Sequence, residues 1–80
     1  MANETNNIQK HYLDYYSDWS LALLSARTYL DMKDVHIKGS AFIGIINELW
    51  DADMIPVELL NSYTTEVNTL TARKLQTYLN

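Results

Sequence analysis

The residues best suited to chemistry or charge-based binding are acidic, and they gather in one part of the chain. Five carboxylates lie between positions 48 and 66, in a stretch without Lys or Arg: Glu48, Asp51, Asp53, Glu58 and Glu66. Asp51 and Asp53 resemble the opening of a calcium-binding loop, but the third oxygen ligand, the glycine and the final glutamate are missing from the required positions. We therefore expect no metal site.

Four of these carboxylates predict a partner-binding patch. Glu48, Asp51, Asp53 and Glu58 would together present negative charge to a basic surface on another protein. The plainer interpretation stays open, in which these side chains are merely solvated at a turn and on the outer faces of two helices.

Signatures of catalysis are missing from the sequence. His11 and His36 are the two imidazoles, and neither stands in a pattern that would assemble a Ser/His/Asp set or an Arg/His nuclease site. The chain has no phosphate-binding loop and no dinucleotide fingerprint. We therefore predict that it is not an enzyme and binds no cofactor.

Aromatic residues form the second conspicuous group. Successive positions on a helix are about 100° apart, so the rings of Tyr12, Tyr15 and Tyr16 cannot all point into one core. Tyr and Trp also contribute much of the binding energy at protein interfaces. Tyr12, Tyr15, Tyr16 and Trp19 are therefore predicted to lie at an interface, the alternative being ordinary half-buried side chains.

Helices must position these groups, and the longest helical pattern is N-terminal. Apolar and aromatic residues recur at intervals of three and four over residues 8–32, which predicts one helix there. Its length would be about 37 Å, against about 25 Å for a compact globule of this size. We expect its first turns to protrude and pack on a second copy or a partner, or else a break near Ser17–Ser20.

Two further helices are expected to fold back on the first. Residues 34–40 are predicted to be the connection, because Gly39 is flexible and Ser40 can cap a helix over residues 41–50. Residues 35–38 alternate apolar with polar and allow a short extended segment, or else Asp34 caps an early turn of the next helix. Residues 51–55 form the second predicted turn, and residues 56–79 the third helix.

Gly44 lies inside the second predicted helix, where it costs about 1 kcal/mol relative to Ala. The usual reason for such a glycine is the close approach of another helix. We therefore expect Gly44 to mark the crossing with the first helix.

Length and charge limit the class of protein. Eighty residues make one domain over 1–80, with a disordered tail over about 1–6, and the absence of Cys excludes disulfides. A net charge of −4 disfavours nucleic acid as a partner. Neither a signal peptide nor a bilayer-spanning stretch is visible, so we expect a cytoplasmic protein without a membrane partner.

The fold class that follows is all-α, a three-helix bundle with a long N-terminal helix. We expect a homodimer, because the long aromatic helix needs more cover than the other two helices provide. The predicted function is that of a small acidic, non-catalytic interaction protein with a protein partner. It would act as a regulator or inhibitor, of the kind carried by mobile genetic elements, and block a host macromolecule by occupying its surface.

Two alternatives come from other classes of protein. One is a dimeric helix-turn-helix transcription regulator, although the third helix opens with Glu58 and offers only Asn61 as an amide for base contacts. The other is a structural subunit of a larger assembly.

Overall fold

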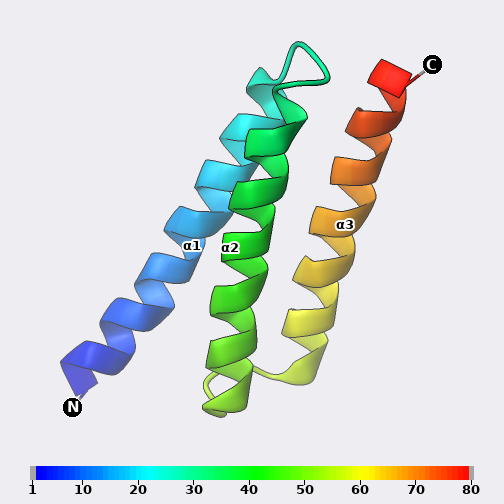
Figure 1. The fold of residues 1–80 in the computed structure, drawn as a ribbon. Helices are drawn as coiled ribbons and strands as arrows, with labels where there is room; N and C mark the ends of the chain where they lie inside the picture. The colour runs from blue at the N-terminus through cyan, green and yellow to red at the C-terminus, as the bar shows by residue number, and fades with distance from the viewer. Residues whose placement is uncertain (1, 80) are drawn as a thin grey trace.

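The structure is a computed structural model that describes the backbone of residues 2–79 and the side chains of residues 11–79. Three helices follow one another in this part of the chain, α1 (Ala2–Ser25), α2 (Met32–Asp51) and α3 (Val57–Leu79), and no strand occurs among them. Neighbouring helices run antiparallel, and α2 lies between α1 and α3 (Figure 1). The all-α, three-helix prediction is confirmed.

α1 ends at Ser25, well before the predicted boundary at residue 32. The Asp31 carboxylate accepts the backbone N–H of Arg27 (2.7 Å) and of Thr28 (3.1 Å), and the Thr28 hydroxyl accepts the Asp31 N–H (3.4 Å). Because the Arg27 and Thr28 N–H groups stabilise the ionised carboxylate, they hold the pKa of Asp31 below its ordinary value. This reciprocal Thr28–Asp31 pairing is a capping box, so Asp31 belongs to the start of α2.

The predicted connection over residues 34–40 is also wrong, because these residues are helical. Asp34 lies in the first turn of α2, where a carboxylate favours the helix dipole, and pairs with Lys38 at 3.2 Å. The buried positions of α2 recur at intervals of three and four, and Gly39 occupies one of them in place of a large apolar residue: Met32, Val35, Gly39, Phe42, Ile46 and Leu49. A sequence pattern that counts only large apolar residues is interrupted at Gly39, so it does not reveal this buried row as one helix.

The three helices have similar lengths. α1 has 24 residues, α2 has 20 and α3 has 23, so no single long N-terminal rod stands out from the bundle. Residues 17–20 do not break α1. The helix as described begins at Ala2, and the tail over residues 1–6 stays a prediction because Met1 and the side chains up to residue 10 lie outside the described part.

The core is centred on the middle of the bundle, where all three helices contribute. Trp19 from α1 and Phe42 from α2 are the largest side chains with almost no exposed surface, and Val67 joins them from α3. The Trp19 indole Nε1–H donates to the Thr71 hydroxyl at 3.1 Å, which satisfies a buried donor across the α1–α3 gap. α3 begins within one residue of its predicted start at Pro56 and carries the expected apolar stripe.

The glycine that marks the helix crossing is Gly39, and the prediction for Gly44 is wrong. A Cβ atom at Gly39 would lie 3.1 Å from Val67 Cγ1 and 3.2 Å from Trp19 Cδ1. A Cβ atom at Gly44 would meet nothing within 4 Å. Close packing of α2 against both neighbours therefore depends on the absent side chain at Gly39.

The overall dimensions and the hydropathy of the helices describe the bundle as a whole. The Cα atoms extend over 48 × 21 × 13 Å, so the bundle is elongated and flattened. In the part of the chain that the structure describes, no helix has both the length and the apolar character needed to cross a bilayer.

Candidate protein-binding surface at the turn between α2 and α3

The four predicted acidic-patch residues come together at one end of the bundle. Glu48 and Asp51 lie in the last turn of α2, Asp53 in the following turn and Glu58 in the first turn of α3, and all four are exposed. This end carries the α2–α3 turn, opposite the α1–α2 turn (Figure 1).

A shallow, open recess of about 490 Å³ lies at this same end. Trp50 keeps 43% of its surface exposed there, and Val57 keeps 42%. Its neighbours on α2, Ile46 and Leu49, are buried in the core. The recess is lined by Trp50, Asp53, Met54, Ile55, Pro56 and Val57. An exposed indole beside carboxylates is suited to contact with a cationic or amphipathic group.

Asp53 adopts a left-handed backbone conformation, with φ at 58°. The Met54 N–H donates to the Leu49 carbonyl (2.8 Å) and the Asp53 N–H to the Trp50 carbonyl (3.0 Å), which is the Schellman pattern of a helix C-terminus. Gly is the residue most often found at this position, because other residues are strained there. Asp is tolerated better than most residues and brings a charge that glycine lacks.

Among the described side chains, Lys and Arg occur only toward the end of the α1–α2 turn, which also carries Asp31 and Asp34. No Lys or Arg occurs between Lys38 and Arg73, a segment that contains the whole acidic end of α2 and most of α3. Among the side chains of α1 that the structure describes, residues 11–25, there is no Lys or Arg; Lys10 precedes them in the sequence, and Arg27 lies in the turn after the helix. The basic residues at the opposite end are Arg27, Lys33, Lys38, Arg73 and Lys74.

The predicted aromatic interface residues lie mostly inside the bundle. Trp19 is 1% exposed and so has no surface to offer a partner, whereas Tyr15 is 38% exposed. Tyr12 and Tyr16 are half-buried, and both rings pack edge-on against Tyr63 of α3, with centroids 6.1 and 5.3 Å away. The interface role stays a prediction, and among these four residues only Tyr15 is largely free to serve it.

Tyr16 links α1 to α3 through its hydroxyl, which donates a hydrogen bond to the Glu66 carboxylate. This bond to Glu66, assisted by burial, raises the pKa of Tyr16 to about 12. Burial also raises the pKa of Tyr63. Both phenols therefore stay protonated well into the alkaline range, and Glu66 serves the packing of α1 on α3.

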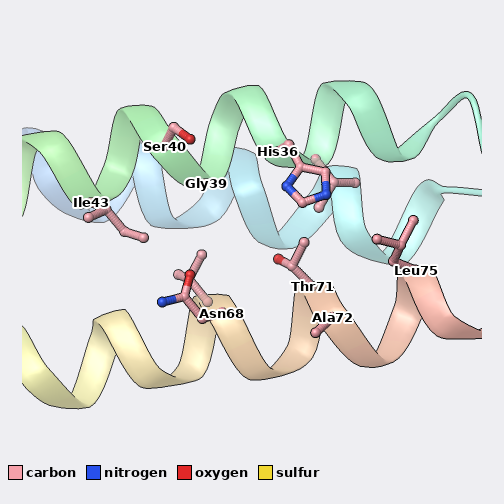
Figure 2. A pocket seen from close by; sticks show the side chains of 10 residues that line it. His36, Gly39, Ser40, Ile43, Asn68, Thr71, Ala72 and Leu75 are labelled. Atoms are coloured by element: carbon pink, nitrogen blue, oxygen red, sulfur yellow. The ribbon is translucent and has the colours of Figure 1, made fainter.

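A second recess, of about 160 Å³, lies between α2 and α3 (Figure 2). His36 and Ser40 border it from α2, while Asn68 and Thr71 border it from α3. Its lining contains no carboxylate, and the Thr71 hydroxyl is engaged by Trp19. The recess therefore lacks a general acid–base pair. Among the described side chains, no three His, Asp or Glu residues gather closely enough to hold a metal ion.

Sequence reasoning located the acidic residues but missed the recess beside them. The signals that could have revealed it were an aromatic residue just before a helix end, an Asp at the Schellman position and a proline after the turn. No protein-family model, no curated protein and no solved structure matches this chain at a significant level.

Proposed function

We propose that this chain is a small, non-catalytic interaction protein that binds a basic surface of a protein partner through the end formed by the α2–α3 turn. The observation that carries the proposal is the exposed Trp50 in a shallow recess, at an end with four exposed carboxylates and with no Lys or Arg among the described side chains. An apolar centre with a polar, charged surround is the usual composition of a protein interface.

The backbone of Asp53 adds support that does not depend on charge alone. A residue other than glycine in a left-handed conformation costs free energy, and such costs collect at functional positions. Under the proposal, the Asp53 carboxylate contributes to binding at the expense of stability. As a regulator or inhibitor, the protein would act by covering part of its partner's surface, and its source in a mobile genetic element remains an expectation from its size and acidity.

Affinity capture from a host lysate, quantified by mass spectrometry, tests the proposal with two charge-matched variants. Asp51→Lys/Glu58→Lys reverses charge at the proposed surface, and Asp14→Lys/Asp18→Lys makes the same net change on the exposed side of α1. We expect the wild type and the second variant to capture a common partner. The captured amount of that partner should be at least tenfold lower for the first variant and for Trp50→Ser. Equal capture by all four proteins would refute the proposal.

Asp53→Gly separates binding from folding at the same position. Relief of the left-handed backbone should raise the free energy of unfolding by up to about 1 kcal/mol, while loss of the carboxylate should weaken partner capture. Asp53→Asn is the control, since it tolerates the backbone but lacks the charge, and it should weaken capture without stabilising. If Asp53→Gly were more stable and bound the partner as well as the wild type, the Asp53 carboxylate would have no part in binding.

We also propose that the chain forms a homodimer, since several leucines remain exposed on its sides, among them Leu24 at 68% and Leu13 at 48%. The geometry does not favour the helix-turn-helix alternative. In that motif two helices meet at about 90–120°, whereas α2 and α3 run side by side along their length (Figure 1).

A further inference from the structure

The α1–α3 side of the bundle contains an uncovered apolar groove. It has a volume of about 300 Å³ and lies between helices whose backbones seldom approach each other. Leu24 lines it from α1 and is 68% exposed. Leu13 is three helical turns earlier on the same face of α1 and is 48% exposed. The groove is lined by Leu23, Leu24, Leu70, Arg73, Lys74 and Thr77.

The charges of the described side chains differ between the two ends of the bundle. Arg73 and Lys74 line the groove at its basic end, where Arg27 is also exposed. Toward the other end, the described side chains of α1 and the first three turns of α3 include no Lys or Arg, and their carboxylates are Asp14, Asp18, Glu58 and Glu66. A molecule placed on this side therefore meets positive charge at one end and negative charge at the other.

From this pattern we propose that a second copy of the chain covers the α1–α3 groove, with the two bundles antiparallel. In that direction the basic end of each copy faces the acidic end of the other, twice per dimer, whereas a parallel pair would oppose like charges at both ends. A two-fold axis across the helices generates this arrangement and closes it. The inference rests on the proposed homodimer and adds its surface and its direction.

The available area agrees with a dimer of this kind. The broad side of the bundle measures 48 by 21 Å between its outermost Cα atoms, roughly 1,000 Å², and a standard interface takes about 800 Å² from each partner. Leu24 and Leu70 would supply apolar contacts in each half of the interface, and Arg73 and Lys74 beside them would face the acidic end of the other copy.

Sedimentation equilibrium of the purified chain over a concentration series tests the surface. We expect the mass of the wild type to approach twice the 9.3 kDa of one chain as the concentration rises. Leu24→Asp should raise the dissociation constant of the dimer at least tenfold. Ile37→Asp is the matched control, because Ile37 is 59% exposed but lies about 200° from the buried Val35 around α2. Arg73→Glu/Lys74→Glu should also weaken the dimer, and more at low salt than at high salt.

Spin labels test the direction, and the absence of Cys makes single labelling sites clean. Ser17→Cys lies near the middle of the bundle and Ser25→Cys at the end of α1. In an antiparallel dimer the two Ser25 labels should be about 24 Å further apart along the helix axis than the two Ser17 labels. Equal distances would mean a parallel pair and overturn the inference.

The outcomes separate the two proposals. A mass of 9.3 kDa at every concentration would overturn the homodimer and this inference together. A dimer that Ile37→Asp disrupts and Leu24→Asp does not would preserve the homodimer and overturn the proposed surface. Because no partner protein is present in these measurements, either result leaves the proposed binding at the α2–α3 turn untouched.

Discussion

The two sides of α1 are packed in different ways. Against α2, backbone approaches backbone, because Gly39 leaves room for Trp19. Against α3, the backbones remain apart and long side chains cross the gap: the Tyr16 hydroxyl reaches Glu66, Trp19 reaches Thr71, and the Tyr78 hydroxyl donates to the Ala26 carbonyl at 2.9 Å. We call the α1–α2 side the sealed side, because the missing side chain of Gly39 lets the two helices pack closely. The α1–α3 side is the open side, because only long aromatic side chains connect its two helices.

This difference explains where the molecule can still bind. A helix pair that packs through a glycine leaves no space between its partners, whereas a pair bridged at intervals leaves apolar area between the bridges. The α1–α3 groove lies in such an interval, between Trp19 and Tyr78 along the helices. The fold is therefore organised around α2, and apolar surface is left open on the α1–α3 side and at the α2–α3 turn.

The largest expected effect is on the residue that belongs to both sides. Trp19→Ala should lower the free energy of unfolding by about 3–5 kcal/mol, because it empties the centre of the core and removes a bridge to Thr71. Trp50→Ala is the matched control at an exposed position and should cost less than about 1 kcal/mol. Urea unfolding measures both, and equal losses would contradict the assignment of the core.

The two glycines test the sealed side next. Gly39→Val should destabilise the protein by up to about 3 kcal/mol, since its side chain would press on Val67 and Trp19. Gly44→Ala should instead stabilise by up to about 1 kcal/mol, because it adds helix propensity in open space. The same unfolding curves report both changes. No loss of stability in Gly39→Val would show that α2 does not pack closely at Gly39.

A smaller loss is expected at one bridge on the open side. Thr71→Val keeps the shape of the side chain but leaves the buried Trp19 indole without an acceptor, at a cost of about 1–2 kcal/mol. Thr69→Val, at an exposed position on the same helix, should change the free energy of unfolding by less than about 0.5 kcal/mol. If the two variants were equally stable, the bridge would contribute nothing.

The smallest effect at neutral pH, and the most specific one, concerns the Tyr16 bridge. The pKa of Tyr16 is about 12 in the folded protein, whereas the ordinary pKa of a tyrosine, which applies to the unfolded chain, is 10.0. Between these values the unfolded state binds fewer protons, so stability falls as the pH rises above about 10. Tyr16→Phe should make this decline shallower, and Tyr15→Phe should leave it unchanged. Identical pH slopes for all three proteins would remove the bridge from the account.

The sequence predicted the helical class and the third helix, because its apolar spacing and Pro56 give direct signals. It misplaced the first turn for two local reasons. Carboxylates near a helix boundary oppose the end of one helix but favour the start of the next, so Asp31 and Asp34 do not by themselves locate the boundary. The flexible connection predicted at Gly39 was wrong, because nothing local distinguishes a glycine in a tight crossing from one in a loop.

The candidate surface was predicted only in part, for a comparable reason. Acidic residues close in sequence around a turn must end up close in space, so their gathering was foreseeable. The exposure of Trp50 was not, because it depends on how far α3 covers the end of α2, which is a matter of tertiary packing.

The most direct test of the open α1–α3 side is a methyl NMR spectrum of the leucine- and isoleucine-labelled protein, recorded from dilute to concentrated solution. If the groove is the surface that a second copy covers, the methyl signals of Leu13, Leu24 and Leu70 should shift with concentration, while those of Ile37 stay fixed. Shifts confined to Ile37, or no shift anywhere across the series, would contradict the account.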